Sequence, residues 1–150
     1  MTDTGPVPRF PPRPEAGSSG HGVGRAEADG WSAATASDAA GYLVFGPYAT
    51  DIPAGNYDAF FRLMVDNRDA NNDIVVTLDV NDYDGGSGMC GVCSLAGRDV
   101  RRMEFTGTFA YQDFVVRFTN PGAGHRIELR TYWTDRSYVR QDRVTVQRVP

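Results

Sequence analysis

The chain has 150 residues, the size of one ordinary domain, and nineteen acidic against fifteen basic residues give it a net charge of −4. This balance argues against nucleic-acid binding, which needs a concentrated basic surface. No apolar run approaches the roughly 20 residues of a membrane-spanning helix, so the sequence predicts no membrane insertion. All fifteen basic residues are arginine, and a chain without lysine has no Schiff-base nucleophile.

Residues 1–20 differ in composition from the rest of the chain. They hold five of the nine prolines and end in a Gly/Ser run, and such a segment cannot bury enough apolar surface to offset its ordering entropy. We therefore predict a flexible, disordered tail or linker over 1–20 and a single domain over 21–150. The first residues contain no positively charged segment followed by an apolar one, so we expect no signal peptide in this chain.

From about residue 22 onward, apolar and polar side chains alternate with a period of two, which is the pattern of strands with one buried face. Clusters of Pro, Gly, Asn and Asp separate the runs. The expected strands, eight or nine in number, span roughly 22–35, 41–48, 56–66, 73–82, 88–95, 99–106, 110–119, 125–133 and 138–148. No long amphipathic helix is available as a crossover between parallel strands. The sequence therefore predicts an all-β fold, a single antiparallel β-sandwich of the jelly-roll type.

Signals of catalysis are weak in this sequence. The two histidines, His21 and His125, stand apart from any Ser/His/Asp or Cys/His arrangement. A glycosidase needs two carboxylates across a sugar cleft, but among nineteen acids such a pair can always be found. Cys90 and Cys93 form a lone CxxC motif without the second pair that a four-cysteine zinc site needs. We therefore predict a protein that is not an enzyme.

Oxygen-bearing side chains gather in two short loops. The segment Asp69-Ala70-Asn71-Asn72-Asp73 places them at alternate positions, which a tight loop can aim at one Ca²⁺. Asp82-Tyr83-Asp84-Gly85 is a shorter version. Asp and Asn also form turns without any metal, so both interpretations are open for each loop.

Aromatic side chains give the positive signal for a function. A flat ring can bury the apolar C–H face of a sugar, while neighbouring polar side chains hydrogen-bond the hydroxyls. The segment 132–138 puts three aromatics, an acid and an arginine into one turn between two expected strands, and Tyr48 lies at another strand end. The candidate sugar-binding residues are Trp133, Tyr48, Tyr138, Asp135 and Arg136. For Trp133 the alternative is a plug that closes one end of the core.

Four segments occur in an order that is typical of one group of binding modules. Glu27-Ala28-Asp29 stands at the first strand, an acidic stretch with glycine follows at 38–44, Pro53–Arg62 carries the pattern Pro-Ala-Gly-x-Tyr, and Asp142 precedes the apolar alternation of the last strand. In this order, over about residues 25–147, the chain resembles carbohydrate-binding modules of families 6 and 35.

This resemblance implies a structural Ca²⁺ within the jelly roll. Its ligands would be the first-strand acids Glu27 and Asp29 and the last-strand Asp142. Asp29 stands where these modules carry a second Glu, and its side chain reaches less far.

The resemblance also implies a sugar cleft in the loops at one end of the sandwich. Trp133 and Asp135 would lie in its last turn, and Tyr48 would form the opposite wall. The Asn that is usual in this turn is absent, with Asp135 and Arg136 in its place, so an acidic or otherwise unusual glycan is one option.

Together these observations predict a non-catalytic, calcium-stabilised module that binds a poly- or oligosaccharide. Such a module is expected outside the cell, fused to or associated with an enzyme. Two other functions are open from the residues: a structural or adhesive β-sandwich that binds protein and no sugar, and a small glycoside hydrolase or lyase that uses loop carboxylates.

Overall fold

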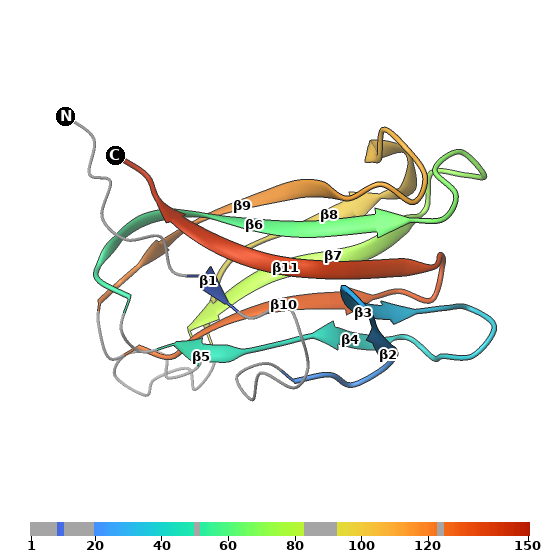
Figure 1. The fold of residues 1–150 in the computed structure, drawn as a ribbon. Helices are drawn as coiled ribbons and strands as arrows, with labels where there is room; N and C mark the ends of the chain where they lie inside the picture. Colours follow the sequence, from blue (N-terminus) through green and yellow to red (C-terminus); the bar gives the residue numbers. More distant parts are fainter. Residues whose placement is uncertain (1–8, 11–19, 50–51, 83–92, 123–124) are drawn as a thin grey trace.

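The computed structural model describes residues 9–10, 20–49, 52–82, 93–122 and 125–150, with the backbone alone for 9–10, 47–49 and 93. These residues fold into two antiparallel β-sheets that lie face to face, which confirms the predicted fold class. Figure 1 shows the two sheets as stacked layers. No helix in the described ranges is long and apolar enough to cross a membrane.

The first sheet contains six strands, namely β1 (Arg9–Phe10), β2 (Arg25–Glu27), β3 (Gly30–Ala33), β6 (Gly55–Val65), β9 (Gln112–Asn120) and β11 (Val139–Arg148). Their order is β2-β3-β11-β6-β9, and β1 also pairs with β11. The second sheet contains five, namely β4 (Gly41–Val44), β5 (Pro47–Ala49), β7 (Ile74–Asp82), β8 (Cys93–Arg101) and β10 (Ile127–Trp133). Their order is β4-β10-β7-β8, and β5 also pairs with β10. In each sheet a late strand therefore lies between two earlier ones.

The strand boundaries differ from the prediction in three places. The ranges 22–35 and 41–48 each divide into two short strands, and Arg9–Phe10 of the predicted tail pair with β11. The rest of that tail lies outside the described residues. The ranges 88–95 and 99–106 were wrong as separate strands, because β8 runs unbroken through Gly97 to a short 3-10 helix, η2 (Arg102–Glu104). A Cβ on Gly97 would lie 3.1 Å from the Leu78 carbonyl oxygen, so this glycine permits a close approach to β7 and makes no turn.

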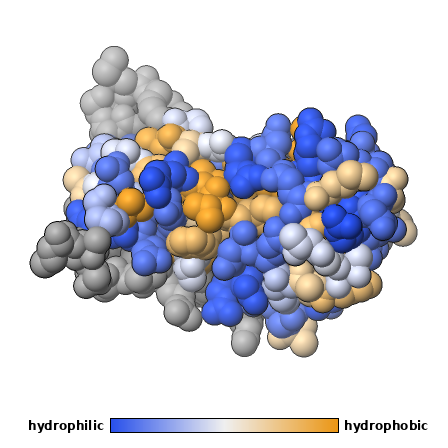
Figure 2. All heavy atoms as spheres, turned by 90° about the horizontal axis from the view of Figure 1, so that it is seen from above, coloured by the Kyte–Doolittle hydropathy of each residue, from blue (hydrophilic) through white to orange (hydrophobic). Residues whose placement is uncertain are grey.

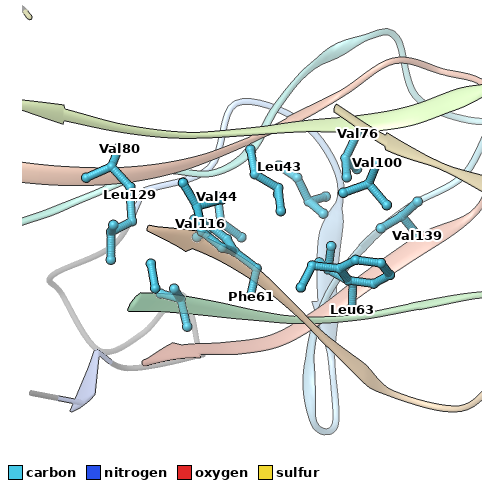
Figure 3. Close-up of a cluster of buried hydrophobic side chains, with 14 of the residues drawn as sticks. Leu43, Val44, Phe61, Leu63, Val76, Val80, Val100, Val116, Leu129 and Val139 are labelled. Atoms are coloured by element: carbon cyan, nitrogen blue, oxygen red, sulfur yellow. The ribbon is translucent and has the colours of Figure 1, made fainter. Parts of the chain in front are cut away.

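The alternating apolar side chains pack between the sheets as expected. Every second side chain of β6 from 57 to 65 is buried, and Figure 3 shows Phe61 of the first sheet near Leu43 of the second. One hydrogen bond joins the sheets inside this core. Thr131 Oγ1 on β10 donates to Gln141 Oε1 on β11 at 2.6 Å, and both side chains are buried. A satisfied polar pair of this kind fixes the relative position of the two sheets.

One buried arginine, Arg102, joins the loops at the right-hand end of the sandwich in Figure 1. Its Nε donates to Asn71 Oδ1 (3.0 Å), and its Nη1 donates to the Asn67 carbonyl oxygen (2.7 Å) and to Ser137 Oγ (3.1 Å). Its Nη2 donates to the Arg136 carbonyl oxygen (2.5 Å). The planar guanidinium thus reaches two loops at once, which a lysine ammonium could not do with the same geometry.

We call this region the Arg102 end, meaning loops 66–73, 102–111 and 134–138. Arg102 ties the loop before β7 to the turn between β10 and β11. The backbone adds to this tie, since the Arg102 amide donates to the Asp73 carbonyl oxygen at 2.9 Å.

We expect Arg102→Met to lower the free energy of unfolding by on the order of 3 kcal/mol, because it removes four hydrogen bonds of a buried guanidinium, one of them to the buried Ser137 hydroxyl. Arg101→Met is the matched control, since Arg101 is exposed and, among the described residues, its side chain donates one hydrogen bond, to the Asn72 carbonyl oxygen. Its expected cost is about 0.5 kcal/mol. Urea unfolding followed by circular dichroism measures both, and equal losses would contradict the role given to Arg102.

Candidate ligand-binding surface

Trp133, the central residue of the predicted sugar site, is fully buried. Its exposed fraction is 0%, and its Nε1 donates to the Ser137 carbonyl oxygen (2.7 Å) inside the β10–β11 turn. The prediction that it offers an open face to a sugar is therefore wrong, and the alternative of a plug at the end of the core is correct. The reason is strand geometry: Trp133 shares the inward side of β10 with Leu129 and Thr131.

The other predicted sugar-binding residues do not meet in one cleft. Arg136 is exposed beside the second sheet, whereas Tyr138 lies towards the first sheet, where its hydroxyl accepts from Arg140 Nε (3.0 Å) and Nη2 (2.8 Å). Asp135 has φ +63°, a left-handed conformation that few non-glycine residues adopt, and it forms the bend of the turn. Tyr48 belongs to β5, and its side chain lies outside the described part of the chain.

A groove of about 420 Å³ opens where the second sheet meets the Arg102 end. It is lined by Asp73, Ile74, Thr77, Arg101, Thr134 and Arg136. Arg136 Nη1 lies 3.5 Å from Asp73 Oδ2, with 61% and 41% of the two side chains exposed. An exposed pair with one long contact adds little stability, so both groups can turn towards a ligand.

A row of side chains continues from this groove across the outer face of the second sheet. Thr77 of β7 lies opposite Tyr132 of β10 on one side and opposite Asp99 of β8 on the other, and Tyr132 lies opposite Tyr42 of β4. We call these four residues the tyrosine row. The Tyr42 and Tyr132 rings meet edge to face with centroids 5.1 Å apart, and Tyr132 is 36% exposed. Thr77 Oγ1 donates to Asp99 Oδ1 at 2.8 Å.

Arg130, two residues before Tyr132 on the same face, holds the aromatic end of the row. Its guanidinium lies 4.7 Å from the centroid of the Tyr42 ring and donates twice to Asp79, at 2.8 and 2.7 Å. The hydrogen bonds to Asp79 raise the pKa of Arg130 and outweigh its partial burial, which lowers it. A charged, doubly bonded guanidinium under the ring keeps Tyr42 in place before any ligand arrives.

Neither Tyr42 nor Tyr132 is among the ligand-binding residues predicted from the sequence. For Tyr132 a signal was present, because the alternation over 127–132 already put it on the opposite face from Leu129. Tyr42 and Thr77 have no local signal. They become neighbours of Tyr132 only through the strand order β4-β10-β7.

Two of the predicted calcium ligands already have partners. Asp29 Oδ1 accepts from Arg140 Nη1 at 3.0 Å, and Glu27 Oε1 lies 3.9 Å from Arg140 Nη2. The other oxygen of Glu27 accepts from the Ser32 hydroxyl at 2.6 Å. A guanidinium therefore stands between these two acids.

The third predicted ligand, Asp142, faces arginines as well. Its Oδ2 lies 3.3 Å from Arg62 Nε and 3.2 Å from Arg143 Nε. In the part of the chain that the structure describes, no group of three or more Asp, Glu, His or Cys side chains is arranged to hold a metal ion. As they are placed here, these residues do not fit the calcium site that the resemblance implies.

The acidic loop before β7 uses its side-chain oxygens for turns and for arginine. Asn71 Oδ1 accepts from the Asp73 amide (3.0 Å) in addition to Arg102, and Asn72 Oδ1 accepts from the Met103 amide (3.3 Å). Of the two interpretations left open, these contacts support turn formation.

Of the remaining sequence candidates, Asp82 and His125 lie at the opposite end of the sandwich. Asp82 Oδ2 lies 2.5 Å from His125 Nδ1, a contact between the end of β7 and the segment just before β10. Asp84 and Cys90 lie outside the described residues, as does the side chain of Cys93.

No protein-family model matches the sequence, and no curated protein matches it either. Solved structures with a similar fold include the C-terminal CBM6 of the laminarinase LamC from Zobellia galactanivorans, at 11% identity and a TM-score of 0.46, covering 99% of this chain and 91% of that one. Another is the module CBM6cm-2 of Cellvibrio mixtus lichenase 5A in complex with cellotriose, at 11% identity and a TM-score of 0.48, covering 100% and 98%.

A third similar structure holds the CBM22-1 and GH10 modules of Clostridium thermocellum xylanase 10B, complexed with xylohexaose. It is 13% identical with a TM-score of 0.50, and the match covers 96% of this chain but 28% of that one. At this level of identity the comparison establishes the fold: the chain has a β-sandwich of a kind that also occurs in carbohydrate-binding modules.

We expect Trp133→Ala to lower the free energy of unfolding by about 3–5 kcal/mol, because it removes a large side chain from a closed core and leaves a cavity. Tyr132→Ala, one residue earlier on the exposed face, is the control with an expected cost of about 1 kcal/mol. Urea unfolding followed by circular dichroism compares them. If the Trp133→Ala protein were as stable as the parent, the indole could not be a buried part of the core.

Proposed function

We propose that the chain is a non-catalytic carbohydrate-binding module that holds an oligosaccharide along the tyrosine row and the adjoining groove. The observation that carries this proposal is the Tyr42–Tyr132 pair, a half-buried ring beside an exposed one, which lies on the same sheet face as an open polar groove of about 420 Å³. Thr77 belongs to both, so the aromatic and polar parts form one continuous surface.

The chemistry of this surface suits a sugar better than an apolar ligand. An aromatic ring covers the C–H face of a pyranose, and Tyr132 presents such a ring at 36% exposure. The groove adds guanidinium donors from Arg101 and Arg136 and hydroxyls from Thr77 and Thr134. Arginine can bond two neighbouring hydroxyls, or one carboxylate, with its fork of donors.

The span of the row favours a short chain over a single sugar. Its four residues stand on four neighbouring strands, and strands about 4.8 Å apart put Tyr42 about 14 Å from Asp99. A ligand that touches both ends must therefore be an oligosaccharide that crosses the strands. Because sugar hydroxyls exchange bonds with water for bonds with protein, we expect affinity to be modest.

The shared fold supports the choice of ligands to test. The xylanase structure of the same fold is described as complexed with xylohexaose, so xylo-oligosaccharides belong in the panel. That structure also joins its binding module to a GH10 module, which supports the proposal that this chain works beside, or fused to, a secreted enzyme. The groove arginines support adding an acidic oligosaccharide.

The test is isothermal titration with neutral and acidic oligosaccharides, using xylohexaose, cellotriose and an oligogalacturonate. We expect at least one to bind the parent, and Tyr132→Ala to weaken that binding about tenfold or more, because the stacking surface is lost. Arg136→Gln should weaken it less, since 61% of the Arg136 side chain is exposed to water.

Val115→Ala is the control, because Val115 is exposed (40%) on β9 of the opposite sheet and its loss should leave binding unchanged. If no oligosaccharide of the panel gives a measurable heat of binding, the result would favour a β-sandwich that binds protein and no sugar. Release of reducing ends during the titration would show hydrolysis and overturn the non-catalytic assignment.

A further inference from the structure

The β2–β3 hairpin is pressed against β11 at a fixed point. A Cβ on Gly30 would lie 2.1 Å from the Gln141 carbonyl oxygen, so only glycine allows this approach. The approach carries Glu27 and Asp29 to β11, where Asp142 lies next in sequence to Gln141. We call Glu27, Asp29 and Asp142 the acidic corner.

Arg140 enters this corner from the middle of the first sheet. On β11 it pairs with Ser32 on one side and with Met64 on the other, so its backbone cannot move without both neighbours. Its Nη1 donates to Asp29 at 3.0 Å, and its Nη2 lies 3.9 Å from Glu27. Nε and Nη2 also donate to the Tyr138 hydroxyl, which holds the guanidinium from its other side.

Among the described residues, the basic groups that face the corner are all arginines. Its three carboxylates face three guanidinium groups, those of Arg62, Arg140 and Arg143. Burial lowers the pKa of Arg140, but its hydrogen bonds to Tyr138 and Asp29 outweigh this and raise the pKa above its ordinary value. The arginine therefore stays charged at neutral pH.

We propose that Arg140 is the resident cation of the acidic corner and that the chain folds without calcium. The bond from Arg140 occupies an Asp29 oxygen that a calcium ion would need, and Ser32 occupies one of Glu27. Calcium needs six to eight oxygen ligands, and its charge would be repelled by the adjacent guanidinium. This inference is independent of sugar binding.

The first experiment measures the melting temperature of the unmodified chain in excess calcium and in EDTA. We expect the two values to agree within about 1 °C, whereas a structural calcium site at saturation would separate them by about 5 °C or more. A rise of that size with calcium would overturn the proposal, whatever any variant does.

The second experiment compares Arg140→Ser with Arg143→Ser, since both arginines face the same corner and only Arg140 is held by Tyr138 and Asp29. We expect Arg140→Ser to lower the melting temperature by about 3–6 °C and Arg143→Ser by about 1 °C. Arg140→Lys keeps the positive charge but lacks the planar guanidinium, so the decrease in its melting temperature should lie between those of the two serine variants. Equal shifts for the two serine variants would remove the special role of Arg140.

Discussion

Strand β10 lies in the middle of the second sheet, between β4 and β7, and a strand must send successive side chains to opposite faces. The inward side chains of β10, which include Thr131 and Trp133, close the core and reach across it to β11. The outward ones, Arg130 and Tyr132, form the centre of the candidate binding surface. A shift of β10 by one residue would exchange the two sets, so core and site depend on one register.

Arginine supplies the polar connections that hold this arrangement. Arg102 joins two loops through neutral oxygens, Arg130 links the Tyr42 ring to Asp79, and Arg140 lies between the β2–β3 hairpin and Tyr138. In each case one planar group bonds partners that are distant in sequence, which a compact ammonium does less well. A chain with fifteen arginines and no lysine is suited to such junctions. The many arginines of the sequence therefore connect segments of the fold that are distant along the chain.

The fold could be predicted from the sequence because alternation and turn residues are local signals. The strand β6 and the strand β11 follow their predicted ranges, and the sandwich follows from them. The site could not be predicted in the same way, because aromatic residues in a turn can point either into the core or out of it. The alternation along β10 already indicated that Trp133 lies on the same inward face as Leu129. The proximity of Tyr42, Tyr132 and Thr77, however, depends on strand order, which alternation does not encode.

The position of the tyrosine row on strands, and not on loops, has an energetic consequence. Loop residues must be ordered when a ligand binds, whereas Tyr132 and Thr77 are already fixed by ladder bonds on both sides of their strands. The β10–β11 turn, which carries the conspicuous aromatics of the sequence, therefore serves mainly as a support: Trp133 fills it from inside and Arg102 binds its backbone from the adjacent loop. The turn presents Arg136 at the rim of the groove: its carbonyl oxygen accepts from Arg102, and its side chain is largely exposed and can reorient. For the oligosaccharide ligand that we propose, we expect the rigid aromatic strip to supply most of the affinity and the adjustable cationic rim to distinguish one oligosaccharide from another.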